Sequence, residues 1–313
     1  MQTQTRTCGL LLQMKLVAPA LFVSDFLMLP VGLTPDEGTC RQDSNILYLP
    51  WLTARGARQV SWLVLPALVP LLRAQPGVGP VYALGEVPPL QGQEAPEVWA
   101  PLMSLPWLCG ADPATAQPWP DRLPYLTVPP ADGACATPRA SAPLTIGLVW
   151  HGNPSHENDA ERSLRSVRAL APLAAALAPA VQAGAVRVLN LQAHAGPDDA
   201  QAAQVARTPA ERDWLALLQP GPDFQDFTDV ARTLQGVDLL ITVDTAYAHL
   251  AGALGRPVWV LLPHWKTDWR WLDGRSDSPW YPGVMRLFRQ PSRGDWASVM
   301  AEVTRALNAH LAA

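Results

Sequence analysis

Short apolar runs alternate with helical stretches through the second half of the chain. Continuous apolar runs, typical of parallel strands covered on both faces, predict strands at 144–150, 185–191, 238–243 and 258–262. Helices are expected at 166–180, around 210–218, at 228–235, at 246–254 and near 295–311. This alternation predicts an α/β fold with a doubly wound parallel sheet and helices on both of its faces.

The first half of the chain shows a weaker alternation of the same kind. Residues 56–64 predict a helix end that passes into a strand, and 78–84 predict another strand. These signals favour a smaller α/β domain at 14–130. The stretch 129–143 is rich in Pro and Ala, so we expect it to link this domain to a second one at 144–313.

Composition narrows the class of protein. The 313 residues suffice for two domains, and 49% hydrophobic with 16% charged residues excludes a disordered chain. A net charge of −4 argues against a nucleic-acid binder. The four cysteines have no CxxC spacing, which argues against a zinc site or a disulfide scaffold and fits the cytoplasm.

The apolar segment 8–23 resembles a membrane-spanning or targeting segment in its composition. Lys15 and Pro19 interrupt it, so it is too short and broken to predict a transmembrane helix. A signal peptide stays open as an alternative, and the folded domain is expected to begin near Met14. Peripheral association with a membrane also stays open.

Residues 236–263 carry the most information about function. The polar turn at 242–245 follows a buried strand directly, and small residues from Ala246 onward predict a helix that Gly255 ends. Open parallel sheets bind ligands at such strand ends, and helix N-termini bind phosphate. Asp244, Thr245 and His249 are therefore candidate phosphate-site residues. The alternative is structural: a helix cap and a packed histidine.

A second strand end, at Trp150, begins a polar loop. Gly152 permits a sharp turn there, and Asn153 tolerates unusual backbone angles. Arg162, later in the loop, offers a planar guanidinium group that matches two oxygens of a diphosphate. The alternative is a solvated loop that caps the next helix.

Two further sites complete the candidate set. Gln192 follows a strand end, where a polar side chain or free backbone can read a nucleotide base. Asp268 and Arg270 lie among tryptophans in a loop that can stack on a sugar or base and hydrogen-bond to its hydroxyls. An ordinary strand end and an aromatic cluster that seals a domain interface are the structural alternatives.

Taken in order, these motifs resemble the C-terminal half of GT-B glycosyltransferases related to family 9, the ADP-heptose:lipopolysaccharide heptosyltransferases. The motifs are WHGNPSHEND at 150–159, RS at 162–163, LQ at 191–192, DF at 226–227, the stretch 236–263, DWRW at 268–271, DSPWYP at 277–282 and RLFRQ at 286–290. The resemblance covers about 144–310 and is closest to a bacterial branch often fused to tetratricopeptide repeats, which this chain lacks. Weaker matches lie upstream, at 50–64, 85–86, 101–106 and 124–126.

The resemblance implies two Rossmann-like lobes, with the nucleotide-sugar donor on the C-terminal lobe and the acceptor on the N-terminal lobe. It implies that the amides at 244–247, with Arg162, hold the diphosphate of an ADP- or UDP-linked sugar. Helix and guanidinium would replace a metal in stabilising the leaving group, so no metal cofactor is expected. The donor-binding set is Trp150, Gly152, Asn153, Arg162, Gln192, Asp244, Thr245, Ala246, His249, Asp268 and Arg270.

The chain departs from the family at the general base of this inverting transfer. The family places an Asp in a Gly-rich loop near the start of the N-terminal lobe, and Asp43 is the corresponding residue here. Gln42 stands where the family has glycine, which penalises a turn with positive φ and makes this lobe degenerate. Asp25 is the second candidate for the base.

Three hypotheses about function follow. The first is a glycosyltransferase whose acceptor is a glycan, a lipid-linked saccharide or a protein hydroxyl. The second is a catalytically inactive nucleotide-sugar-binding or scaffold protein that retains the donor lobe. The third, a dinucleotide-dependent oxidoreductase, is disfavoured because no GxGxxG follows an early strand.

Overall fold

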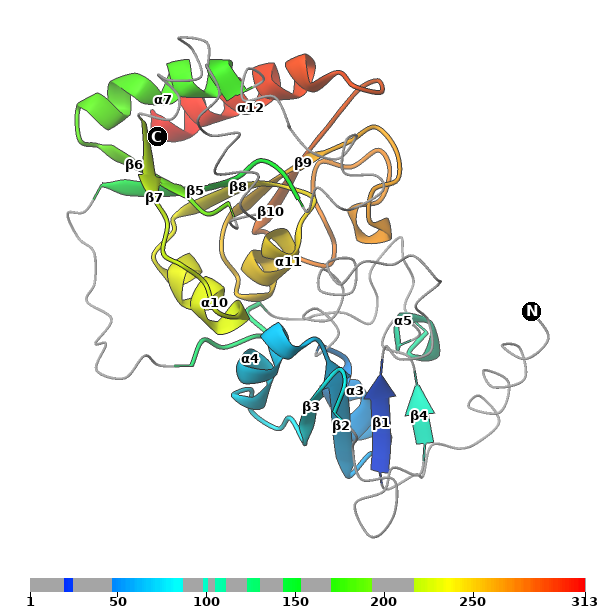
Figure 1. The fold of residues 1–313 in the computed structure, drawn as a ribbon. Coiled ribbons are helices and arrows are strands. Elements are labelled where there is room, and N and C mark those ends of the chain that lie inside the picture. Colours follow the sequence, from blue (N-terminus) through cyan, green and yellow to red (C-terminus); the bar gives the residue numbers. More distant parts are fainter. Residues whose placement is uncertain are drawn as a thin grey trace. The chain divides into compact units, whose positions relative to one another are not determined.

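The computed structural model describes residues 20–24, 47–86, 98–100, 105–110, 123–129, 143–152, 170–192 and 217–312. The chain divides into two compact units. The first comprises residues 1–129 together with Gln225–Asp229, and the second comprises 130–224 and 230–313. Each unit is built around its own parallel sheet (Figure 1).

The first unit contains a four-stranded sheet of order β3-β2-β1-β4, in which every paired strand is parallel. Its strands are β1 (Ala20–Ser24), β2 (Gln59–Val64), β3 (Val81–Ala83) and β4 (Val98–Ala100). Its described helices are α3 (Leu49–Ala54), η2 (Pro66–Leu68), α4 (Val69–Arg73) and α5 (Leu105–Leu108). The predicted passage from helix to strand before residue 64 and the predicted strand near residue 81 are confirmed.

Apolar side chains of β2 and α4 form the core of this unit. Trp62 and Leu71 are among its most buried side chains. Two hydrogen bonds fix the backbone at Thr127. The buried side chain of Gln75 donates to the backbone oxygen of Thr127 (2.9 Å) and accepts from its N–H (2.8 Å). The paired bonds satisfy an amide that burial would otherwise leave at a cost.

The second unit contains a six-stranded parallel sheet of order β10-β9-β8-β5-β6-β7. Its strands are β5 (Leu144–Val149), β6 (Val186–Asn190), β7 (Leu218–Pro220), β8 (Leu239–Val243), β9 (Val258–Leu262) and β10 (Met285–Arg289). All residues of β8 and β9 are buried, as expected for central strands covered on both faces.

Helices cover both faces of this sheet. They are α7 (Ala171–Gln182), α10 (Phe227–Gln235), α11 (Ala246–Ala253) and α12 (Trp296–Leu311). The short helix η5 (Trp269–Trp271) lies in the loop between β9 and β10. Figure 1 shows α7 and α12 side by side over one face, and α10 and α11 on the other. Alternate residues of the strands, such as Ile146, Ile241 and Leu261, pack against Leu173 of α7 and Val303 of α12 in one apolar core.

Two edge strands differ from the prediction. The helix predicted around 210–218 lies mostly outside the described residues, and at Leu218 the structure has strand β7, so the prediction is wrong there. Strand β10 was not predicted, because Arg286 and Arg289 interrupt its apolar residues. Both strands lie at an edge of the sheet, where polar residues and Pro220 are tolerated.

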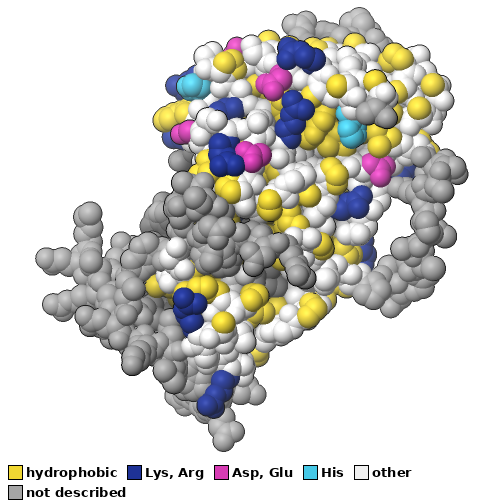
Figure 2. Space-filling view, turned by 180° about the vertical axis from the view of Figure 1, so that it is seen from behind, with side chains coloured by type: hydrophobic (Ala, Val, Ile, Leu, Met, Phe, Trp, Pro, Cys, Tyr) yellow, Lys and Arg dark blue, Asp and Glu magenta, His cyan; other side chains and the backbone are white. Residues whose placement is uncertain are grey.

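On one face of the molecule, the charged side chains of the described residues do not form a patch of one sign (Figure 2). On the face drawn in Figure 2, basic and acidic side chains of the upper part lie interspersed among hydrophobic ones. Within the described ranges, no helix is long and apolar enough to span a bilayer.

Candidate functional site

The topology of the six-stranded sheet fixes where a ligand is expected. Strand β5 comes first in this unit and pairs with β6 on one side and β8 on the other. The chain thus proceeds outward in both directions from β5, which makes the carboxyl ends of β5 and β8 the topological switch point. Open parallel sheets bind ligands in the crevice at this point.

The side chain of Gln192 holds the described start of the loop that follows β5, at Trp150 and His151. Gln192, just after β6, accepts through Oε1 from the backbone N–H groups of Trp150 (3.2 Å) and His151 (3.1 Å). Its Nε2 donates to the backbone oxygen of His151 (2.9 Å). Gln192 therefore fixes the path of the backbone at Trp150 and His151, immediately before Gly152.

Helix α11 begins at the carboxyl end of β8. Thr245 is its N-cap residue and has an extended backbone, but its side chain does not cap the helix. The Thr245 hydroxyl instead pairs with that of Thr242 (2.9 Å). The first turn, which starts at Ala246, thus has no oxygen from the N-cap side chain as acceptor, the arrangement found where a helix binds an anion.

The side chain of Tyr247, in the same first turn, was not among the candidates, although its backbone amide was. Its ring lies edge-to-face with Phe224, with ring centres 6.2 Å apart. Burial raises the pKa of the Tyr247 phenol to about 12, so the side chain stays neutral and adds no negative charge beside the helix start. No local pattern in the sequence pairs these two aromatic residues.

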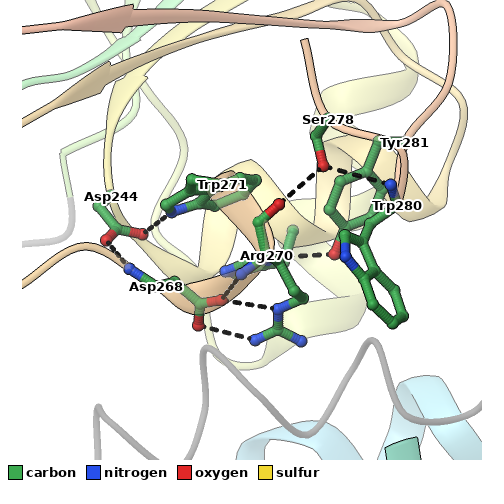
Figure 3. Close-up of polar contacts among 8 residues, drawn as sticks. Asp244, Asp268, Arg270, Trp271, Ser278, Trp280 and Tyr281 are labelled. Carbon is green, nitrogen blue, oxygen red and sulfur yellow. Dashed lines mark hydrogen bonds and ion pairs between the residues drawn. The ribbon is translucent and has the colours of Figure 1, made fainter. Parts of the chain in front are cut away.

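Asp244, between β8 and α11, holds a distant turn in place (Figure 3). Its Oδ1 accepts from the indole Nε1 of Trp271 (2.8 Å), and its Oδ2 accepts from the backbone N–H of Asp268 (3.3 Å). The carboxylate thereby joins the carboxyl end of β8 to η5. These two hydrogen bonds fix the position of the turn relative to the end of β8.

Asp268 and Arg270 form a buried ion pair within the turn (Figure 3). The Asp268 carboxylate accepts from Nε and from an Nη atom of Arg270, both at 3.0 Å, and from the Arg270 backbone N–H at 2.9 Å. Burial raises the pKa of Asp268, but the charge of Arg270 and then that of His249 outweigh it, so the pKa lies well below its usual range. The pair is ionised and fixes η5.

His249 lies fully buried under this turn. Its ring stacks on Trp271 with centres 4.6 Å apart, and its Nδ1 lies 2.9 Å from the hydroxyl of Tyr281. Gly252, one turn further along α11, makes room for Tyr281, since a Cβ there would lie 2.4 Å from the phenol ring. His249 thus packs as part of the support for α11.

Arg289 and Gln290, at the end of β10, were not among the candidate site residues predicted from the sequence. Arg289 donates to the Thr267 hydroxyl (3.2 Å) and to the backbone oxygen of Leu272 (2.6 Å). Half-burial lowers the Arg289 pKa, and the nearby Asp273 and Asp244 carboxylates oppose that shift. The RLFRQ motif was the available signal, but it does not reveal which loop these side chains hold.

The structure brings most of the predicted site residues to one edge of the sheet. Trp150, Gly152 and Gln192 lie at the ends of β5 and β6, and Asp244, Thr245, Ala246 and His249 follow β8. Asp268 and Arg270 join them through η5. Asn153 and Arg162 lie outside the described residues, as do both base candidates, Asp43 and Asp25. Among residues with assigned structure, no group of three His, Cys, Asp or Glu side chains is placed to hold a metal ion.

Comparison with known families agrees with this geometry. Residues 177–262 match the family model described as glycosyltransferase family 9 (heptosyltransferase). The matched stretch includes β6, β8, α11 and β9, and so contains Gln192 and the turn at 244–246. The predicted resemblance to family 9 is thereby confirmed over these residues.

A curated relative matches over part of the chain. It is Protein FlbA of Caulobacter vibrioides, 38% identical over 95 residues, which are 30% of this chain and 15% of FlbA. The match therefore spans less than a sixth of that protein.

Solved structures with similar folds cover nearly the whole chain. E. coli ADP-heptose lps heptosyltransferase II is 14% identical with a TM-score of 0.55, covering 94% of this chain and 98% of its own. A glycosyl transferase family 9 protein from Veillonella parvula DSM 2008 is 12% identical, with a TM-score of 0.54 and 94% and 98% coverage. The iron-containing dodecameric glycosyltransferase TibC from enterotoxigenic E. coli H10407 is 14% identical, with a TM-score of 0.52 and 96% and 76% coverage. At these identities the likeness shows the fold, and the predicted GT-B-like α/β architecture with parallel sheets is confirmed.

Proposed function

We propose that this chain is a glycosyltransferase that moves a sugar from a nucleotide-diphosphate sugar to a hydroxyl acceptor. The observation that carries the proposal is the start of α11. It lies at the carboxyl end of β8, beside the switch point of the sheet, and its N-cap side chain makes no capping hydrogen bond to the first turn. This start falls within the stretch that matches family 9.

The first-turn amides and the dipole of α11 would hold the donor diphosphate. They stabilise the charge that develops on the leaving diphosphate as the bond to the anomeric carbon breaks. We propose Arg162 as a second cationic group for this charge, and a reaction that needs no metal. The donor is an ADP- or UDP-linked sugar, and a structure of TibC is described as a complex with ADP-D-beta-D-heptose.

Other predicted donor-binding residues act by positioning the site. Gln192 uses its side-chain amide on the loop at Trp150 and His151. Asp244 uses its carboxylate to place η5. The ion pair of Asp268 and Arg270 is buried, so we assign it the same role.

The first unit would bind the acceptor and supply the general base. Residues 25–46 connect the carboxyl end of β1 to the segment that leads into α3, so both base candidates belong to this connection. We propose that Asp43 takes the proton from the acceptor hydroxyl as its oxygen attacks the anomeric carbon, with inversion, and Asp25 is the alternative base. The acceptor is a glycan, a lipid-linked saccharide or a protein hydroxyl. The scattered cysteines, among them the buried free thiol of Cys109, support a reaction in the cytoplasm.

A thermal-shift screen tests the donor site directly. The purified chain is heated with ADP, UDP, GDP, their monophosphates and their common sugar conjugates, with and without EDTA. We expect one diphosphate to raise the melting temperature more than its monophosphate does, and EDTA to leave the shift unchanged. Binding without sugar transfer or donor hydrolysis would instead show an inactive nucleotide-sugar-binding protein, and a flat screen would contradict the donor site.

A single substitution separates the helix start from the rest of the site. Ala246→Pro removes one N–H from the first turn, and proline is tolerated there because that amide has no partner within the helix. The extended backbone of Thr245 also suits a following proline. We expect nucleotide affinity to fall about tenfold, equal to about 1.4 kcal/mol, while the ligand-free melting temperature changes little. Unchanged affinity in a folded variant would contradict the proposed diphosphate site.

A further inference from the structure

His151 is a polar residue at the switch point of the sheet that was not among the predicted site residues. It comes two residues after β5 and is partly buried. The last paired residues of β5 and β8 are Val149 and Thr242, and Asp244 comes two residues after this pair on the β8 side. Because neighbouring strands lie about 5 Å apart, His151 belongs to the same crevice as the residues that lead into α11.

Both the backbone and the ring of His151 are held in place. Gln192 accepts from the His151 backbone N–H (3.1 Å) and donates to its backbone oxygen (2.9 Å). The imidazole lies edge-on to the Trp150 ring, with ring centres 6.0 Å apart, and its Nδ1 lies 2.9 Å from the backbone oxygen of Gly152. The position of the ring is therefore set before any ligand binds.

The contact with Gly152 decides which ring nitrogen carries the proton. A backbone oxygen can only accept, so Nδ1 donates to it, and the neutral ring then has its lone pair on Nε2. The Gln192 amide nitrogen also lies 3.2 Å from Nδ1, but it has a closer acceptor in the backbone oxygen of His151. Within the described part of the chain the ring makes its polar contacts at Nδ1, which leaves Nε2 as an acceptor for a ligand.

An acceptor nitrogen beside a diphosphate site favours a hydroxyl group as its partner. Phosphate oxygens are themselves acceptors at neutral pH, whereas a hydroxyl can donate to the lone pair of Nε2. In a nucleotide-diphosphate sugar, hydroxyls lie on both sides of the diphosphate, on the ribose and on the sugar to be transferred. A diphosphate bound at the start of α11 brings one of these groups towards the neighbouring end of β5.

We propose that Nε2 of His151 accepts a hydrogen bond from a hydroxyl of the nucleotide sugar, either on the ribose or on the transferred sugar. His151 then determines specificity, because a ligand that lacks this hydroxyl leaves the nitrogen without its partner. The inference rests on the proposed glycosyl transfer and adds to it a residue that contacts the donor. It also gives the hydrogen bonds of Gln192 a purpose, since they hold the residue that makes this contact.

His264 provides a matched control within the same sheet. It also comes two residues after a strand, β9, and its backbone N–H donates to a glutamine side chain, that of Gln290 (3.2 Å). Its Nδ1 likewise lies 3.2 Å from a backbone oxygen, that of Gln290. Strand β9 lies on the far side of β8 from β5, so its end is away from the switch point. His264→Ala should therefore leave nucleotide binding unchanged.

Calorimetric titration with ligands that lack single hydroxyls tests the contact. The probes are ADP and UDP, their 2′-deoxy and 3′-deoxy forms, ADP-glucose and UDP-glucose, each titrated into the unmodified chain, His151→Ala and His264→Ala. If a ribose hydroxyl is the partner, His151→Ala should weaken binding of the intact nucleotide about fivefold and leave that of one deoxy form unchanged. If the partner is on the transferred sugar, nucleoside diphosphates should bind equally and the sugar conjugate about fivefold more weakly.

Two further substitutions separate the Nε2 contact from the path of the loop. Asparagine places its amide near the position of Nδ1, and glutamine places its amide near that of Nε2. His151→Asn keeps a donor for the Gly152 oxygen but should bind the ligand as weakly as His151→Ala. His151→Gln offers an oxygen at the place of Nε2 and should restore affinity to within about twofold of the unmodified chain. The ligand-free melting temperatures should stay close to that of the unmodified chain.

Two results would overturn the inference while leaving the donor site intact. The first is equal affinity of the unmodified chain and His151→Ala for every probe. The second is equal weakening for all probes, deoxy forms included, without rescue by His151→Gln, which would mean that His151 only shapes the loop. If the unmodified chain bound none of the nucleotides, the donor site itself would fail and the inference with it.

Discussion

Two aspartates flank strand β8, and they do different work. Asp238, just before the strand, accepts from the backbone N–H of Thr145 on the neighbouring β5 (2.8 Å). Asp244, just after it, accepts from the Trp271 indole and from the Asp268 backbone, 27 and 24 residues further along the chain. Asp238 thus links the amino ends of two adjacent strands, and Asp244 fixes the position of a loop.

The same difference separates the two ends of the parallel strands, called here the amino edge and the carboxyl edge of the sheet. At the amino edge, Arg187 of β6 donates to the Thr145 hydroxyl (2.9 Å), so the polar groups bind one another across neighbouring strands. At the carboxyl edge, Gln192, Asp244 and Gln290 each hold a loop. A parallel sheet thus uses one end for closure and the other to organise a binding surface.

Breaking the buried ion pair at the carboxyl edge should have the largest effect. Asp268→Asn leaves the Arg270 charge buried without its counter-ion, and we expect a loss of about 3 kcal/mol in the free energy of unfolding. Asp277→Asn is the matched control, because Asp277 pairs with Arg275 through the same two-bond geometry but on the exposed surface. Urea denaturation should show little change in the control. Equal effects would contradict the burial of the Asp268 pair.

The same pair predicts a dependence on pH. The folded pKa of Asp268 lies below its unfolded value of about 3.9, so the stabilisation is complete above about pH 5 and is lost progressively as the pH falls from there towards the folded pKa. One such group gives a slope of up to about 1.4 kcal/mol per pH unit. The difference in stability between the unmodified chain and Asp268→Asn should therefore shrink between pH 5 and pH 3. A constant difference would mean that charge is not its source.

Alanine at the two flanking aspartates tests the comparison itself. Asp238→Ala leaves the Thr145 N–H without its acceptor, and Asp244→Ala does the same to the Trp271 indole N–H and the Asp268 backbone N–H. Each variant should cost about 2 kcal/mol or more. Only Asp244→Ala should also weaken nucleotide binding, about fivefold, because only it releases η5. Calorimetric titration with the nucleotide found in the screen measures this. Tighter binding in Asp244→Ala would show instead that the carboxylate acts mainly as a negative charge near the diphosphate.

The sequence predicted elements that carry continuous apolar runs. Strand β9 was predicted with its observed bounds, and α11 to within one residue, because burial on both faces leaves an unbroken apolar signal. The edge strands carry no such signal. Arg286 in β10 packs its guanidinium over Phe288, which the alternation of residue types does not reveal.

The candidate site was predicted as a set of residues but not as a set of contacts. Position after a strand end was enough to select Gln192, Asp244 and Thr245, because topology brings such ends together. The pairing of Asp244 with Trp271 depends on how the loop after β9 folds back. Nothing in the local sequence specifies that return, and Gln290, which holds the same loop, was missed for this reason.

Two threonines, one at each edge of the sheet, allow the comparison of the two edges with the smallest expected effect. Thr145→Val at the amino edge removes the acceptor of Arg187, and Thr245→Val at the carboxyl edge removes the partner of the Thr242 hydroxyl. Each should lower the free energy of unfolding by about 1 kcal/mol, since the shape is kept and one short hydrogen bond is lost; Thr145→Val also loses the long bond to the Pro143 oxygen (3.4 Å). Nucleotide binding should weaken about twofold in Thr245→Val alone, because only that hydroxyl orients the residue from which α11 begins. Equal nucleotide affinities in the two variants would show that the hydroxyl pair at the carboxyl end of β8 is as purely structural as its counterpart at the amino end.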